Sequence, residues 1–71
     1  MIYDNIVELA KKRNMPLYKI EKEAGLANGV ISKWKSNSPQ VDNLMAVARV
    51  LNVTLNRLVR GYESEIDKRE N

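Results

Sequence analysis

The 71-residue sequence contains no cysteine, no histidine and no phenylalanine, and it has only two prolines and three glycines. Without cysteine no disulfide framework can form, and without cysteine and histidine the usual ligands of a zinc cluster are missing. The same absences remove the commonest general base and a common nucleophile. We therefore expect no metal, no cofactor and no enzymatic activity, and a fold held together by packing alone.

Long apolar runs are also missing. No stretch approaches the roughly 18 apolar residues that a membrane-spanning helix requires, and the first residues lack the basic, apolar and small-residue order of a secretory signal. We expect a cytoplasmic protein with no membrane partner.

Charge is distributed unevenly along the chain. Residues 62–71 contain four acidic and two basic residues, whereas residues 1–61 contain ten basic and five acidic residues, a net charge of +5. Such a surplus is compatible with a polyanionic partner, although charge alone does not identify one. We predict one domain over residues 1–61 and a charged, flexible C-terminal tail over residues 62–71.

Apolar residues recur at three- and four-residue steps in five segments, which predicts five helices and no strand. The helices are expected from Ile2 to about Arg13, from Pro16 or Leu17 to Ala24, from an Asn28 cap to before Pro39, from Val41 to Leu51, and from a Thr54 cap to Gly61. Left-handed residues at Asn14 and Gly25 would end the first two helices. The fourth helix should be the most buried, because its apolar set is dense: Val41, Leu44, Met45, Val47, Ala48 and Leu51.

The second and third predicted helices have the parts of a helix-turn-helix, two short helices with a tight glycine-containing link. In this frame Gly25 turns the chain and Leu26 fills the corner. Ile31 and Trp34 would press the third helix onto the others, so we expect Trp34 in the core rather than stacked on a base.

From Ile20 to Trp34 the sequence resembles the phage-repressor-type (XRE, lambda-repressor-like) helix-turn-helix family. The resemblance continues beyond this run at Pro39, Leu44, Ala48, Leu51, Val53, Leu55 and Leu58. The resemblance covers about residues 4–61, and residues 28–34 are similar to the recognition helix of phage and mobile-element regulators from Gram-positive bacteria. It implies a compact five-helix, all-α domain that binds DNA through its second and third helices.

The function that this resemblance implies is sequence-specific regulation of transcription. We expect a repressor or Cro-like protein that binds a pseudo-palindromic operator in double-stranded DNA as a homodimer, with no small-molecule ligand. A protein-interaction module, such as the antitoxin of a toxin–antitoxin pair, is the alternative.

The resemblance also implies two groups of site residues, and the last predicted helix offers a candidate dimer surface. Bases in the major groove would be read by Asn28, Gly29, Ser32 and Lys33, because asparagine pairs with adenine, lysine donates to guanine, and glycine permits close approach. Phosphates would be bound by Lys19, Lys35, Ser36, Asn37, Ser38 and Asn43. The dimer surface would consist of Leu55, Leu58, Val59 and Tyr62.

Some of these assignments have alternatives. Lys33 and Lys35 also fit an ordinary solvated helix face, and Val30 is an alternative contact for a thymine methyl group. Tyr18 and Arg13 fit either a phosphate contact or a plain surface position.

The sequence departs from the family at two positions of the second helix. Many members carry glutamine where this chain has Leu17 and alanine where it has Glu21. We expect Glu21 to reach solvent or to pair with a basic side chain such as that of Lys33, because a buried and unpaired carboxylate is costly.

Overall fold

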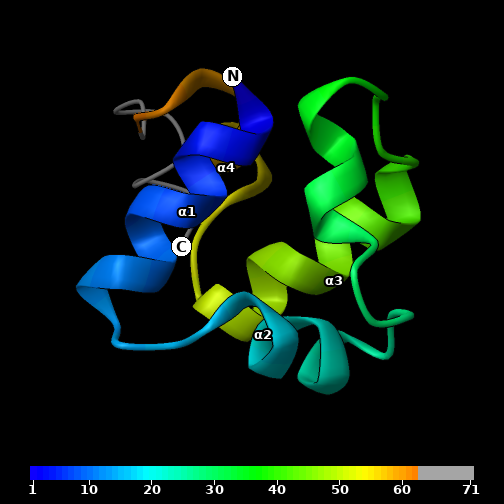
Figure 1. Cartoon of the computed structure of the whole chain (residues 1–71). Helices are drawn as coiled ribbons and strands as arrows, with labels where there is room; N and C mark the ends of the chain where they lie inside the picture. Colours follow the sequence, from blue (N-terminus) through cyan, green and yellow to red (C-terminus); the bar gives the residue numbers. More distant parts are fainter. Residues whose placement is uncertain (63–71) are drawn as a thin grey trace.

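The computed structural model describes residues 1–62 of the chain, and all regular structure in this range is helical (Figure 1). In chain order the elements are α1 (Ile2–Lys12), α2 (Leu17–Ala24), the 3-10 helix η1 (Ile31–Lys35), α3 (Val41–Leu51) and α4 (Leu55–Arg60). The all-helical expectation is confirmed for these residues. The expected number of five α-helices is not, since the third segment forms a short 3-10 helix.

Helix ends follow the chemistry of single residues. Asn14, Gly25 and Asn52 all have positive φ angles, of 53°, 75° and 57°. At each of them two backbone N–H groups turn back to the carbonyls of the preceding helix; at Gly25, for example, Leu26 donates to the carbonyl of Glu21 over 2.8 Å. The predicted left-handed stops at Asn14 and Gly25 are confirmed.

The start of α4 is also as predicted. The Thr54 hydroxyl accepts a hydrogen bond of 3.0 Å from the backbone N–H of Arg57, which satisfies one of the free donors in the first turn.

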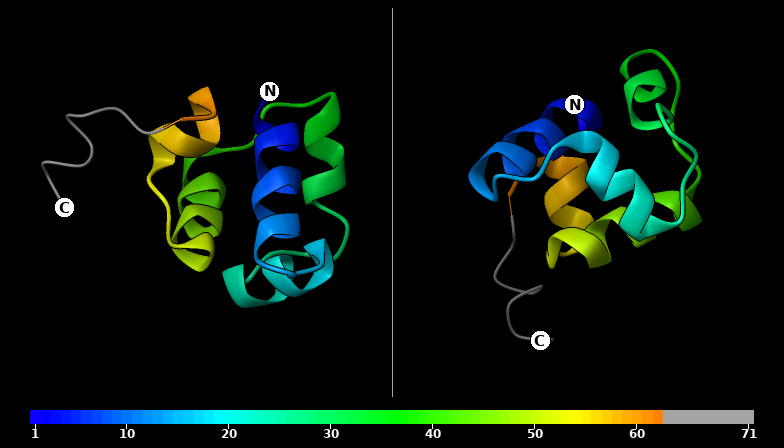
Figure 2. Two further views of the ribbon diagram at one scale, coloured as in Figure 1. Left: turned by 90° about the vertical axis from the view of Figure 1, so that its left-hand side faces the viewer. Right: turned by 60° about the horizontal axis from the view of Figure 1, so that its bottom comes forward.

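The helices form two layers around one core. α1 and η1 run side by side, α2 lies across one end of this pair, and α3 and α4 cover the other side (Figure 2). The buried apolar residues come from all five elements: Ile6, Leu9, Ala10, Ile20, Ile31, Trp34, Leu44, Val47, Ala48, Leu51 and Leu58. The core position of Trp34 is confirmed.

α3 is the most buried helix, as predicted, although not every residue of its dense apolar set is buried. It contributes four buried residues, more than any other element, but Val41 and Met45 are exposed. Both lie on the side of α3 that no other element covers, because a domain of this size has no further layer to place there.

Polar contacts tie α1 to α4. The side-chain amide of Asn5 donates to the carbonyl of Leu58 over 2.7 Å, and a guanidinium nitrogen of Arg57 lies 2.7 Å from a carboxylate oxygen of Glu8. The hydrogen bond from Arg57, together with the nearby charge of Lys12, lowers the pKa of Glu8 below its ordinary value of 4.5. These contacts fix the last helix against the first.

Two further predictions concern a membrane-spanning helix and the C-terminal tail. No helix in residues 1–62 is long and apolar enough to cross a membrane. The predicted C-terminal tail lies outside the described residues, apart from Tyr62.

Candidate nucleic-acid interface

The turn between α2 and η1 is built on two glycines with positive φ angles. Gly25 ends α2 at φ 75°, and Gly29 precedes η1 at φ 87°. Leu26 is half-buried and packs against the core, as expected for the residue that fills the corner of a helix-turn-helix. A residue with a side chain is strained at such angles, so the sequence places glycine where the chain changes direction.

Glu21 on α2 is buried, with 3% of its surface exposed, and its carboxylate faces this turn. One oxygen accepts a hydrogen bond of 3.0 Å from the N–H of Gly29, and the other accepts one of 2.9 Å from the N–H of Ile31. The prediction that Glu21 reaches solvent or pairs with Lys33 is therefore wrong. Backbone donors satisfy the carboxylate instead.

The expected cap of the third helix is also wrong. η1 begins at Ile31, its N-cap residue is Val30, and no side chain of its own segment caps it. Asn28 lies in the preceding turn with its side chain exposed. Glu21, from the neighbouring helix, supplies the acceptor that Asn28 was expected to supply.

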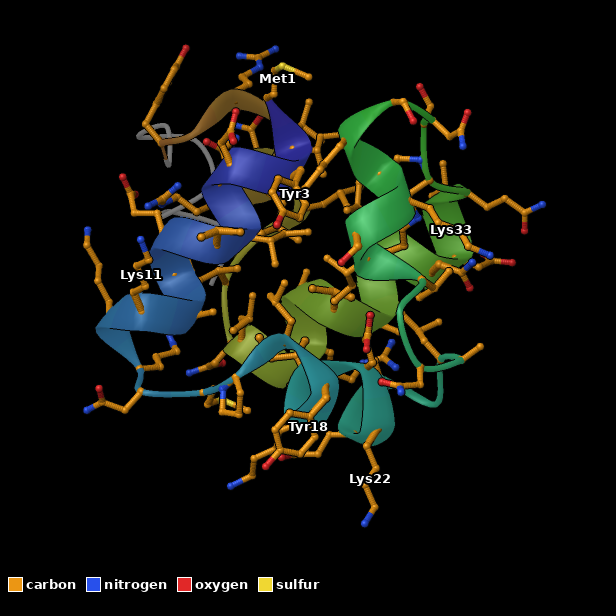
Figure 3. All side chains as sticks on the ribbon, viewed as in Figure 1. Met1, Tyr3, Lys11, Tyr18, Lys22 and Lys33 are labelled. Carbon is orange, nitrogen blue, oxygen red and sulfur yellow. The ribbon has the colours of Figure 1, made fainter. Side chains whose placement is uncertain are left out.

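The candidate base-reading residues surround this turn. Ile31 and Trp34 are buried and hold η1 against the core, while Ser32 and Lys33 are exposed on its outer side. Figure 3 shows Lys33 on the side of the molecule opposite to Lys11. Asn28, Ser32 and Lys33 are thus all exposed and accessible to a ligand.

Gly29 and Val30 differ from the other candidates. The N–H of Gly29 is already bonded to Glu21 and is not free to bind a ligand. The space beside its Cα is open, so a ligand can approach the backbone there. Val30 is half-buried and packs against the core, which leaves little of it for a thymine methyl group.

A shallow hollow beside the turn brings α2 into this surface. Tyr18, Lys22 and Asn28 line it together with Glu21 and Leu26, and Lys19 is not among its lining residues. Tyr18 and Lys22 stand one turn apart on α2 and extend from it in the same direction (Figure 3). Lys22 is therefore the α2 cation that shares this hollow with Asn28, and sequence reasoning missed it. The four-residue spacing from Tyr18 was the available signal.

The candidate phosphate-binding residues lie mostly at the far end of η1. Ser36, Asn37 and Ser38 are exposed in the loop that follows it, and Asn43 is half-buried in the first turn of α3. Lys35 points towards α1, since its ammonium nitrogen lies 5.1 Å from the centre of the Tyr3 ring. The polar loop, rather than Lys35, dominates this end of the surface.

The basic cluster at the end of α1 lies elsewhere. Lys11 and Lys33 are on opposite sides of the molecule in Figure 3. Lys11, Lys12 and Arg13 close α1, where cations interact favourably with the helix dipole. The structure does not bring them together with the candidate base-reading residues.

The predicted dimer surface on α4 loses one member. Leu58 has no exposed surface and belongs to the core, so its assignment to an intermolecular contact is wrong. Leu55, Val59 and Tyr62 are exposed and follow one another at four- and three-residue steps. Helical geometry places Leu55 and Val59 on one face of α4, whereas Tyr62 follows the end of the helix at Gly61.

Comparison with known proteins agrees with this geometry. A family model described as helix-turn-helix matches residues 6–58, which includes α2, η1 and the turn between them. No curated protein and no solved structure matches the sequence.

The chain belongs to the XRE family of helix-turn-helix proteins. It is a DNA-binding regulator of transcription, and α2 with η1 is its helix-turn-helix. This is a family of DNA-binding regulatory domains, which are generally not enzymes.

Proposed function

We propose that this protein is a sequence-specific repressor or Cro-like protein of a phage or mobile element, and that it binds a partly palindromic operator as a homodimer. One observation carries the proposal: Asn28, Ser32 and Lys33 are exposed around a segment whose other side is buried. Side chains of these types hydrogen-bond to base edges in the major groove.

The surroundings of these residues fit contacts with the DNA backbone. Hydroxyl, amide and ammonium groups flank them at Lys22 on one side and at Ser36, Asn37 and Ser38 on the other. Such groups bind phosphate oxygens, which fix the position and orientation of a protein on the duplex without reading its sequence.

The proposal of a dimer rests on α4. Leu55 and Val59 expose 36% and 47% of their surfaces on one face of α4, and Tyr62, just after the helix, exposes 58%. Burying them against a second copy would remove this apolar area from water. Two copies related by two-fold symmetry would place their recognition segments about 34 Å apart, one turn of DNA.

Selection of bound sequences from a random pool of duplex DNA tests the specificity. We expect one enriched sequence that contains two inverted half-sites. Sedimentation of the protein with the enriched duplex then tests the dimer, with two chains per duplex as the expected result. A pool without enrichment would refute sequence-specific binding, and one chain per saturated duplex would refute the dimer.

A further inference from the structure

Glu21 is the one buried charged side chain among residues 1–62. A carboxylate in such a place is stable only where donors replace the water that it has lost. Here both oxygens have a donor, from Gly29 at 3.0 Å and from Ile31 at 2.9 Å. Because both donors are backbone groups, the carboxylate holds the path of the chain itself.

The two bonds hold a segment that has few local constraints of its own. η1 comprises five residues, and no side chain within its segment caps it. In the turn before it, the N–H of Val30 bonds to the carbonyl of Ala27 over 3.2 Å. Glu21 therefore joins α2 to both the turn and the first residue of η1.

The residues proposed to read DNA lie on either side of these bonds. Asn28 immediately precedes Gly29, and Ser32 and Lys33 immediately follow Ile31. Any rotation of the chain between Gly29 and Ile31 would change the distance between Asn28 and Lys33. Base recognition by paired hydrogen bonds tolerates little such movement.

We propose that Glu21 is a positioning residue for DNA recognition, and that its carboxylate fixes Asn28 and Lys33 in the relative arrangement that reads the operator. This inference rests on the proposed sequence-specific function. Glu21 itself does not contact DNA in this account.

A positioning role can be distinguished from a purely structural one because η1 has a second anchor, the burial of Ile31 and Trp34 in the core. Their packing holds η1 on the core, so loss of the two bonds loosens the turn without unfolding the domain. Loss of a negative charge beside a polyanion favours binding to every DNA sequence. A positioning role therefore predicts that specific binding weakens while non-specific binding does not.

The test compares Glu21→Gln with Glu23→Gln. The glutamine at position 21 keeps the size of the side chain but has one oxygen, so only one of the two N–H groups keeps its acceptor. Glu23 is exposed on the same helix, and its substitution removes the same charge. Fluorescence anisotropy measures how tightly each protein binds two duplexes, the operator obtained by selection and a scrambled sequence. The measurements are made at a temperature where circular dichroism shows that the protein is folded.

We expect the ratio of specific to non-specific affinity to fall about tenfold in Glu21→Gln, equivalent to about 1.4 kcal/mol, and to change less than twofold in Glu23→Gln. An unchanged ratio in Glu21→Gln, or an equal fall in both variants, would overturn the positioning role. A wild-type protein without any sequence preference would instead refute the proposed function, and the positioning role with it.

A measurement on the wild-type protein keeps the inference testable if Glu21→Gln fails to fold. Gly29 lies in an exposed turn, so its amide hydrogen should exchange as fast as that of Asn28 unless Glu21 protects it. We expect exchange of the Gly29 amide to be at least about tenfold slower than that of Asn28 after correction for intrinsic rates. Equal rates would overturn the inference without any variant.

Discussion

The carboxylate of Glu21 shows why some single residues escape prediction from sequence. The need to neutralise a buried charge was predictable, but the sequence suggested a cation or solvent as the partner. The actual partners are the N–H groups of Gly29 and Ile31, which every residue type except proline offers. Residue identity therefore gave no sign of them, and only the approach of α2 to the turn determines the contact.

Residues that act through their own backbone preferences were predictable. Asn14, Gly25 and Thr54 do what their chemistry favours locally, two as left-handed helix stops and one as a hydroxyl cap. The exposure of Asn28, Ser32 and Lys33 follows in the same way, since the burial of Ile31 and Trp34 leaves them on the other side of their segment.

We predict that Lys33→Ala lowers discrimination between the operator and a scrambled duplex by about 1 to 3 kcal/mol, the range for one lost base contact. Lys11→Ala is the matched control, because it removes the same charge from the opposite side of the molecule (Figure 3). Competition binding at fixed salt measures both. Equal losses of affinity for both duplexes in Lys33→Ala would identify Lys33 as a phosphate contact.

Among the elements, the α-helices agree with their apolar periodicity, whereas η1 does not. The predicted span of residues 41–51 is reproduced by α3, and α1 ends within one residue of the expected position. η1 is shorter than predicted because its course depends on Glu21 and on the burial of Ile31 and Trp34. These are tertiary contacts, and a short segment has little helical preference to oppose them.

Two neighbouring residues of α3 test the description of the core. Leu44 is 5% exposed and Met45 is 45% exposed. We predict that Leu44→Ala lowers the free energy of unfolding by about 2 to 5 kcal/mol, through lost burial and the resulting cavity. Met45→Ala should change it by less than about 1 kcal/mol. Urea unfolding measures both, and similar losses in the two variants would refute the assigned orientation of α3.

The contact between α1 and α4 predicts a dependence of stability on pH. Because the pKa of Glu8 is lowered in the folded protein, its contribution is present above the unfolded value and is lost as pH falls through the folded value. We predict that Glu8→Gln has a lower melting temperature than the wild-type protein at pH 6. This difference should disappear as the pH is lowered below 4.5 and past the pKa of Glu8 in the folded protein. Thermal melts across this range decide it; a difference that grows on acidification would contradict the lowered pKa.

For the whole molecule, the absence of cysteine and histidine and the apolar spacing predicted a small helical domain, and the basic surplus was compatible with a polyanionic partner. The family match over residues 6–58 includes the helix-turn-helix that was predicted from the second and third helical segments. The residues of the proposed dimer surface were harder to predict, because Leu55, Leu58 and Val59 all recur at three- or four-residue steps along one helix. That spacing cannot separate a face buried in the core from one left exposed, and the packing of α4 assigns Leu58 to the core.

The proposed homodimer makes a prediction about Val59. An aspartate in place of this exposed valine would set two like charges against each other across the two-fold axis and bury them. We expect Val59→Asp to weaken dimerisation at least about tenfold without unfolding the chain. Val41→Asp, at an exposed valine of α3, is the control. Sedimentation equilibrium measures both, and unchanged association of Val59→Asp would exclude this face of α4 as the interface.

The exposed residues around η1 are proposed to read DNA, and parallel selections with the wild-type protein and Asn28→Ala test this role. Wild-type protein should enrich a sequence with two inverted half-sites whose centres are about 34 Å apart. Asn28→Ala should enrich the same arrangement with the preference lost at one base pair of each half-site and retained at the others. Identical preferences for the two proteins, or a wild-type pool without an enriched sequence, would contradict this account.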